Sequence, residues 1–255
     1  MRFFHQGLLA GLLFLAPVEL LAQNVSSGTA VRLTIGQQAV VQNLANNTSQ
    51  GWFNFQPRPG RSYCASVTFS HISALASGMT QGDPVVTVFQ SDGTTVVAIN
   101  DDIGTEPDAD LQSRACFIWP SVGNTGFIRA TQVSNTANSY DVRIIETTMF
   151  CPWFFISGDY NAFTLIRNTT DSSVNFTVNW RNSAGAIVGT TSGTLAGNAN
   201  TAINAVSFVN SATAPNGSIE IVHDGSEDAL KASTTTLSAT TGLGFDALFE
   251  QRRSQ

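Results

Sequence analysis

The stretch DPVVTVFQSDGTTVVAINDD, which runs from Asp83 to Asp102, decides the fold class of this chain. It holds two runs of Val, Thr, Ile and Phe, residues that fit the pleated, half-buried surface of a strand. Residues Ser91-Asp92-Gly93 separate the runs, and Asp-Gly is a strong signal for a tight hairpin turn. The stretch therefore predicts a β-hairpin whose second strand ends in acidic residues.

The acidic end of this hairpin is a candidate metal site. The folded hairpin would gather oxygen-bearing side chains from Asp83, Asp92, Asn100, Asp101 and Asp102. Calcium takes about six to eight oxygen ligands, and an acidic loop can supply them. More carboxylates follow in the same loop, at Glu106, Asp108 and Asp110. Calcium is therefore the one candidate cofactor, and the alternative is a solvated loop whose charge aids solubility.

The N-terminus has the layout of a secretory signal peptide. Arg2 precedes an apolar run from Leu8 to Ala16, and Leu20-Leu21-Ala22 places a small residue at a cleavage point. The run is too short for a membrane-spanning helix, which needs about 20 apolar residues. We expect residues 1–22 to be removed. The mature chain would then be secreted, periplasmic or extracellular, without a transmembrane segment.

The composition narrows the classes of partner. Only 12% of the 255 residues are charged and the net charge is −6, with Lys231 as the single lysine. Nucleic-acid binding needs clustered Lys and Arg against the phosphates, so it is excluded. Electrostatic attachment to anionic lipid is excluded for the same reason.

Short alternating runs, broken by Gly, Asn, Asp and Pro, predict an all-β chain of two sandwich domains, jelly-roll-like or immunoglobulin-like. The boundary falls at Thr147–Phe150, which gives domains at 23–147 and 148–255. Strands are predicted in the first domain at 31–35, 39–44, 52–55, 63–69, 85–90, 95–99, 114–119, 127–132 and 140–146. Strands are predicted in the second at 153–156, 162–167, 174–181, 187–191, 201–205, 218–223 and 229–237.

Several segments of the first domain carry a family resemblance. They are Gly51-Trp-Phe-Asn-Phe55, Gly60-Arg-Ser-Tyr63, the Asp83–Asp102 hairpin, and Gly126-Phe-Ile-Arg129 with Ser139-Tyr-Asp-Val-Arg143. In these segments residues 24–147 resemble the bacterial pre-peptidase C-terminal domain. The resemblance implies a β-sandwich module of secreted hydrolases and surface proteins, some of which bind calcium, collagen or polysaccharide. Residues 148–250 resemble an uncharacterised sandwich of exported bacterial proteins, through Cys151-Pro-Trp-Phe154, Tyr160–Asn168 and Gly242–Asp246.

Three cysteines follow the leader, at positions 64, 116 and 151. Side chains alternate between the two faces of a strand. Cys64 therefore points to the face away from Tyr63, and Cys116 points to the face away from Phe117, which is the less apolar face of each strand. A Cys64–Cys116 disulfide is therefore predicted if the two strands are neighbours. Cys151 would remain as a buried small hydrophobic residue, or would pair with Cys116 instead.

The sequence contains no recognisable catalytic constellation. After the leader it has only His71 and His223, no Gly-x-Ser-x-Gly elbow and no Cys-x-x-Cys pair. Among the four tryptophans, Trp119 and Trp180 alternate with polar residues as core residues do, and Trp153 sits in an apolar cluster expected at the domain junction. Trp52 is the candidate for an exposed sugar-stacking ring, with core packing as its alternative.

These observations predict a secreted protein that is not an enzyme. We expect a binding or surface-structural role with contacts to polysaccharide or to another exported or surface protein. Neutral Asn- and Thr-rich surfaces and strand edges suit hydrogen-bonded contacts better than charge steering. The alternative is an accessory module that serves a secreted hydrolase or protease in trans.

Overall fold

The computed structural model describes residues 24–69, 82–103, 111–120 and 123–252. Within these ranges the chain forms β-strands, with 3₁₀ turns at Ser27–Thr29 and Ala205–Ser207 and no α-helix, so the all-β prediction is confirmed. None of the helices described there is long and apolar enough to cross a membrane. The predicted signal peptide and the acidic residues Glu106, Asp108 and Asp110 lie outside the described residues.

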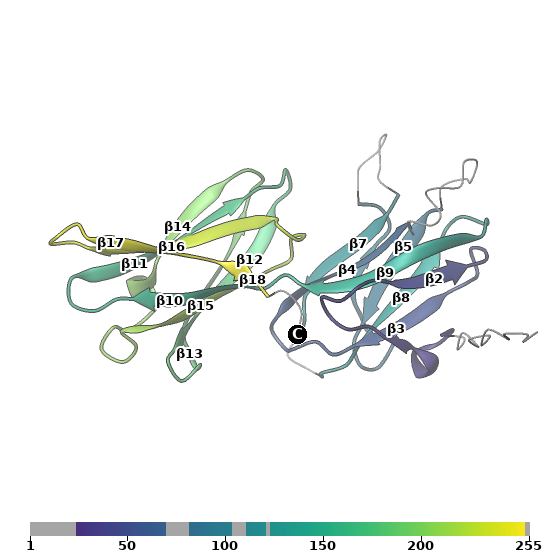
Figure 1. Cartoon of the computed structure of the whole chain (residues 1–255), viewed down its shortest axis with the longest axis horizontal. Helices are drawn as coiled ribbons and strands as arrows, with labels where there is room; N and C mark the ends of the chain where they lie inside the picture. The colour runs from purple at the N-terminus through teal and green to yellow at the C-terminus, as the bar shows by residue number, and fades with distance from the viewer. Residues whose placement is uncertain (1–23, 70–81, 104–110, 121–122, 253–255) are drawn as a thin grey trace, which may run out of the picture.

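The first group of strands forms two packed sheets (Figure 1). One sheet has the order β1-β3-β8-β5-β6 and the other has the order β2-β9-β4-β7. The strands are β1 (Val31–Arg32), β2 (Val40–Leu44), β3 (Gly51–Phe55), β4 (Ser62–Phe69), β5 (Pro84–Phe89), β6 (Val96–Asn100), β7 (Ser113–Ile118), β8 (Gly126–Gln132) and β9 (Asn138–Glu146).

The second group also forms two sheets, with orders β13-β12-β15-β10-β18 and β14-β11-β16-β17 (Figure 1). Its strands are β10 (Met149–Phe155), β11 (Tyr160–Asn168), β12 (Val174–Asn182), β13 (Ile187–Leu195), β14 (Asn200–Asn204), β15 (Asn216–His223), β16 (Leu230–Ser238), β17 (Gly244–Leu248) and β18 (Glu250–Gln251). Strands β17 and β18 lie beyond the last strand that the sequence predicts, and β10 begins four residues before its predicted start at 153.

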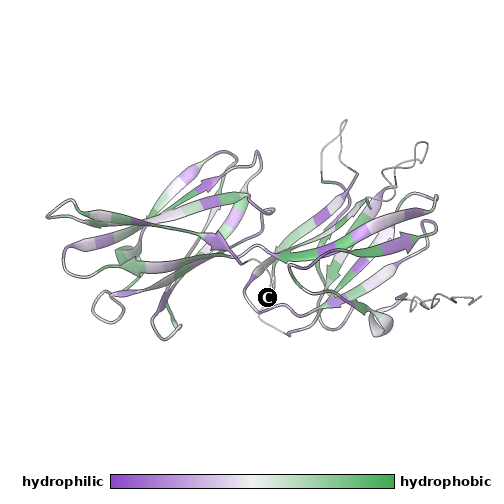
Figure 2. Cartoon of the chain, in the orientation of Figure 1, coloured by the Kyte–Doolittle hydropathy of each residue, from purple (hydrophilic) through white to green (hydrophobic). Residues whose placement is uncertain are grey.

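Alternation along the strands builds a separate core in each group. Along β12, Val174, Phe176, Val178 and Trp180 are buried between the sheets, whereas Asn175 is exposed. In the first group Trp119 is fully buried and packs edge-on against Phe55. Figure 2 shows the resulting mixture of hydrophobic and hydrophilic residues along the strands. The predicted core positions of Trp119 and Trp180 are therefore confirmed.

The Cys64–Cys116 disulfide is present, because β4 and β7 are antiparallel neighbours in which these two residues face each other directly. Both cysteines lie on the outer face of their sheet, as the alternation predicts. Cys64 is nevertheless buried, and its Sγ lies 3.6 Å from the carbonyl oxygen of Gly225 in the second domain. Cys151 is a free and buried thiol, and burial raises its pKa.

The two domains meet around the short link Thr147-Thr148, between β9 and β10. Glu220 of β15 is 3% exposed and forms ion pairs with Arg61 of the first domain, at 2.5 Å, and with Arg181, at 3.2 Å. The Arg61 guanidinium also lies over the Phe150 ring, 4.6 Å from its centroid. The junction is therefore built from charged and hydrogen-bonded side chains that are shielded from water.

Candidate functional site

The β5–β6 hairpin brings three of the predicted metal ligands together. Asp83 precedes β5, and Asp101 and Asp102 follow β6. Antiparallel pairing therefore places all three at the same end of the hairpin, away from its turn. One carboxylate oxygen from each of these residues lies within 4.8 Å of the others. The Ser113 hydroxyl of β7 lies within hydrogen-bonding distance of the carbonyl oxygens of Pro84 and Asp101, either of which can accept its proton, so it links the two strand ends.

The electrostatics of this acidic cluster suit a cation. Burial raises the pKa of Asp83, and repulsion from Asp101 and Asp102 adds to the shift. Burial, followed by repulsion from Asp102, also raises the pKa of Asp101. One buried oxygen of Asp83 and one of Asp102 find no hydrogen-bond partner within the described part of the chain. Closely spaced carboxylate oxygens without donors are a donor set that a hard divalent cation prefers.

Asp92 does not join the cluster, so this part of the prediction is wrong, whereas Asn100 directly precedes Asp101 and stays a prediction. Asp92 lies in the hairpin turn, at the opposite end of β5 and β6, where its side chain accepts hydrogen bonds from Thr94 and Thr95. The bond from the Thr95 hydroxyl is the main reason that the pKa of Asp92 falls to about 2. The Asn100 side-chain oxygen accepts from the backbone N–H of Arg114. Asp92 is therefore separated from Asp83, Asp101 and Asp102 by the length of the hairpin.

Trp52 is not an exposed platform. Its side chain is 8% exposed, its ring stacks on Phe89 with centroids 5.2 Å apart, and Arg129 lies over it. Trp52 lies on the outer face of β3, opposite the core residues Phe53 and Phe55, but this face is covered at this point. Trp52 is buried, as the core-packing alternative requires, but it packs on the outer face of its sheet and not with the cluster of buried residues between the sheets.

A cluster of aromatic side chains instead lies on the surface of the second domain. Trp153 is 39% exposed and Phe245 is 44% exposed, and their ring centroids lie 5.2 Å apart. Phe155 lies nearly parallel to Trp153 at 6.1 Å, and Tyr160 lies nearly parallel to Phe245 at 5.9 Å. Phe155 and Tyr160 close the set with an edge contact at 5.6 Å. We call these four residues the aromatic cluster.

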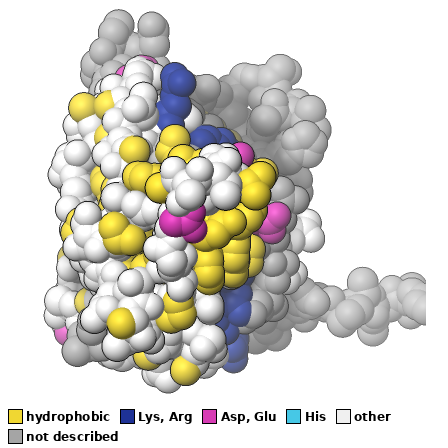
Figure 3. All heavy atoms as spheres, turned by 90° about the vertical axis from the view of Figure 1, so that its left-hand side faces the viewer, with side chains coloured by type: hydrophobic (Ala, Val, Ile, Leu, Met, Phe, Trp, Pro, Cys, Tyr) yellow, Lys and Arg dark blue, Asp and Glu magenta, His cyan; other side chains and the backbone are white. Residues whose placement is uncertain are grey.

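The aromatic cluster spans both sheets of the second domain, because β10 belongs to one sheet and β17 to the other. Exposed Leu237, Leu243 and Leu248 belong to β16, β17 or the turn between them. Figure 3 shows hydrophobic side chains gathered on this end of the domain, with few charged groups among them. The expectation that Trp153 packs at the domain junction is wrong, since its ring partners belong to the second domain.

Sequence reasoning missed this cluster because one of its four rings, Phe245, comes from β17. Gly242 and Gly244 frame Leu243, and glycine weakens a strand pattern, so no strand was predicted there. One signal was available in β10. Trp153 and Phe155 flank Phe154, and residues two apart share a face of a strand. Phe154 is fully buried, which leaves its two neighbours on the outer face.

Comparisons with known proteins give no family for the chain. Neither a protein-family model nor a curated protein matches it. A glycosyl hydrolase family 2 member from Bacteroides cellulosilyticus is 10% identical, with a TM-score of 0.22, and the match covers 81% of this chain and 28% of that one. A calcium-binding mutant of β-glucuronidase 2 from Bacteroides uniformis is 8% identical, with a TM-score of 0.22, over 87% of this chain and 32% of that one. The chain thus spans less than two thirds of either structure, and likenesses at these TM-scores support no statement about activity.

Proposed function

We propose that this protein is an exported, non-catalytic binding protein and that its aromatic cluster binds polysaccharide. The observation that carries the proposal is the set of four neighbouring rings, two of them more than a third exposed, on one surface of the second domain. Contiguous apolar surface on a soluble domain marks an interaction site, since exposing it to water costs free energy. The C–H faces of sugar rings cover aromatic rings while their hydroxyl groups stay hydrated.

The polar surroundings of the aromatic cluster favour a sugar over a charged ligand. Asp159 precedes Tyr160, whereas the Asp246 side chain points to the face of β17 opposite Phe245. The Asp159 carboxylate already accepts a hydroxyl hydrogen bond from Ser238 and has further lone pairs available. Neutral hydroxyl donors of a glycan suit such an acceptor, whereas a polyanion would be repelled by it.

A contact with another exported protein is the second candidate, and the position of β17 favours it. Within the described residues β17 pairs only with β16, so its outer backbone edge is open. An added strand could pair with this edge and cover the exposed leucines. The resemblance of the first domain to pre-peptidase C-terminal modules would fit either role, including service to a secreted hydrolase.

Export and calcium belong to the same proposal. The signal-peptide pattern supports export, and the Cys64–Cys116 disulfide is typical of oxidising compartments. Asp83, Asp101 and Asp102 would supply oxygen ligands to calcium, which would neutralise their mutual repulsion. The metal would then stabilise the hairpin end of the first domain.

Binding to insoluble and gel-embedded polysaccharides tests the function directly. The double variant Trp153→Ala/Phe245→Ala should lower affinity at least about tenfold, which corresponds to about 1.4 kcal/mol. Leu165→Ala/Ile187→Ala removes exposed apolar side chains of the same domain outside the cluster and should bind as wild type does. Equal retention of both variants, or no retention of the wild-type protein on any glycan, would contradict the proposal.

A further inference from the structure

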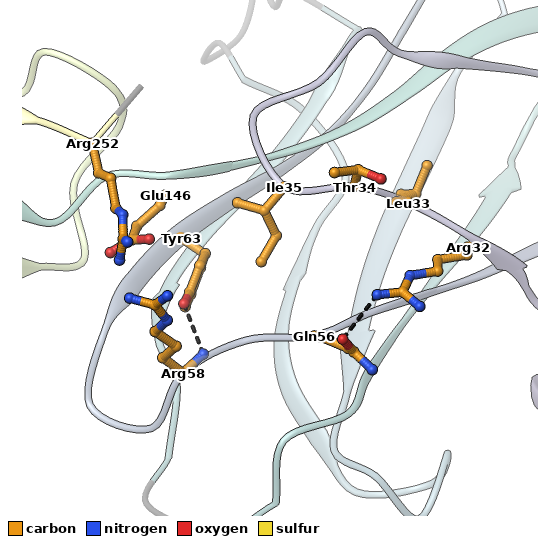
Figure 4. Close-up of a pocket in the computed structure, with 9 residues that line it drawn as sticks. All are labelled: Arg32, Leu33, Thr34, Ile35, Gln56, Arg58, Tyr63, Glu146 and Arg252. Carbon is orange, nitrogen blue, oxygen red and sulfur yellow. Dashed lines mark hydrogen bonds between the residues drawn. The ribbon is translucent and has the colours of Figure 1, made fainter. Parts of the chain in front are cut away.

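A cavity of about 170 Å³ lies at the end of the first domain that faces the C-terminal segment. Its walls come from Arg32 and the segment after β1, from Gln56 and Arg58 between β3 and β4, and from Glu146 at the end of β9. Arg252, which follows β18, completes the lining. Segments that are far apart in the sequence therefore converge on one small cavity, which Figure 4 shows in close-up.

The lining carries an excess of positive charge in an acidic protein. Three arginines, at positions 32, 58 and 252, oppose the single carboxylate of Glu146, which leaves two positive charges in excess (3 minus 1). The chain as a whole has a net charge of −6. Figure 4 shows Arg58 and Arg252 on either side of Glu146, with Arg32 on the opposite side of the cavity. One carboxylate cannot neutralise all three guanidinium groups.

Arg32 in particular keeps its charge free for a ligand. Its Nη2 donates to the side-chain oxygen of Gln56 at 2.8 Å, and it has no ion-pair partner among the described residues. A guanidinium has five N–H donors, so several remain after this bond. Gln56 holds the group beside the cavity without cancelling its charge.

Leu33, Ile35 and Tyr63 contribute apolar atoms to the lining between the charged groups. Leu33 is buried, and Figure 4 shows the Ile35 side chain between Tyr63 and the Arg32–Gln56 pair. The Tyr63 hydroxyl accepts a hydrogen bond from the backbone N–H of Arg58 at 2.8 Å. Burial is the main reason that the pKa of Tyr63 rises to about 12, so the phenol keeps its proton.

We propose that this cavity binds a small organic carboxylate. The guanidinium fork matches the planar carboxylate group, and the Leu33–Ile35 wall takes an apolar body. A volume of about 170 Å³ is of the size that a short acid needs. The Glu146 carboxylate within the lining disfavours doubly charged anions such as sulfate.

Calorimetric titration of the full chain with sodium benzoate, sodium propionate and sodium sulfate tests this site, with sodium chloride holding the ionic strength constant. We expect one saturable benzoate site per chain, weaker propionate binding and no sulfate binding. The double variant Arg32→Gln/Arg58→Gln should weaken benzoate at least tenfold. Both side chains are exposed, so the variant should fold, and its thermal midpoint checks this.

Arg167→Gln is the matched control, because Arg167 is an exposed arginine of β11 without an ion pair among the described residues. It should bind benzoate as wild type does. Sulfate binding as tight as benzoate binding, an equal loss in the control, or no saturable carboxylate binding would overturn the proposal. The aromatic cluster shares no residue with this cavity, so polysaccharide retention can fail or succeed independently.

Discussion

His223 is a buried histidine that the domain junction holds in its neutral form. Its Nε2 lies 3.0 Å from the carbonyl oxygen of Thr147, which can only accept, so Nε2 carries the proton. Nδ1 has no partner among the described residues. Burial lowers the pKa of His223 and outweighs the opposite effects of the Thr147 carbonyl, Asp224 and the Gly225 carbonyl. Its hydrogen bond ties β15 to the link between the two domains.

This burial predicts a stability that falls in mild acid. Below the unfolded-state pKa of about 6.5, His223 is protonated in the unfolded chain but stays neutral in the folded protein. The free energy of unfolding therefore decreases as pH falls. The slope approaches about 1.4 kcal/mol per pH unit until the folded pKa is reached. His223→Gln should reduce the slope between pH 7 and 5 in urea unfolding. An unchanged slope in the variant would contradict the assignment.

At the scale of single elements, the β5–β6 hairpin was predictable and its metal ligands were only partly so. Local sequence determines the turn, because Gly93 adopts φ +68° and Asp92 caps the following N–H groups. Because Asp92 lies in this turn, its carboxylate is at the end of the hairpin away from the acidic cluster. Which carboxylates converge depends on strand direction and on Ser113 of a third strand, and these are tertiary features.

Calcium should stabilise the first domain through the acidic cluster. Calcium at about 100 times its dissociation constant would add about 2.7 kcal/mol to the free energy of unfolding, since it binds only the folded state. Asp101→Asn should abolish the calcium-dependent rise of the thermal midpoint, measured with calcium or with chelator. Asp92→Asn is the matched control and should respond as wild type does. No rise in the wild-type protein would rule the site out.

The disulfide between β4 and β7 should contribute substantially to stability. It closes a loop with a sequence separation of 52, for which the chain-entropy model gives about 4 kcal/mol. Cys64→Ala/Cys116→Ala should lower the free energy of urea unfolding by up to that amount. Dithiothreitol should destabilise the wild-type protein similarly and leave the double variant unchanged. A double variant as stable as the oxidised wild type would show that the bridge constrains little.

At the scale of the whole molecule, Glu220 links the two domains. Its carboxylate is shared by Arg61 of one domain and Arg181 of the other, and it is shielded from water. Removing one partner of a buried ion pair is costly because the remaining charge stays desolvated. The two domains should therefore unfold together rather than independently.

Glu220→Gln should lower the free energy of unfolding by about 3 kcal/mol and separate the calorimetric transition into two. The physical reason is that Arg61 and Arg181 would remain partly buried without their common carboxylate. Asp228→Asn provides the control, because the Asp228–Lys231 pair is exposed and such pairs contribute about 0–1 kcal/mol. Equal effects of both substitutions would show that the junction does not depend on this cluster.

The sequence by itself determined the all-β class, most strands and the less apolar face on which Cys64 and Cys116 lie, because alternation and turn chemistry are local properties. The pairing of β4 with β7, which brings the two cysteines together, is a tertiary feature. Tertiary structure alone decided which three acidic residues meet, why Trp52 is buried, and that Trp153 meets Phe245 on the surface. It also decided the arginine-lined cavity, whose walls come from β1, β9 and the residue after β18. These features arise from contacts between segments that are distant in the chain, and strand periodicity carries no information about which strands become neighbours.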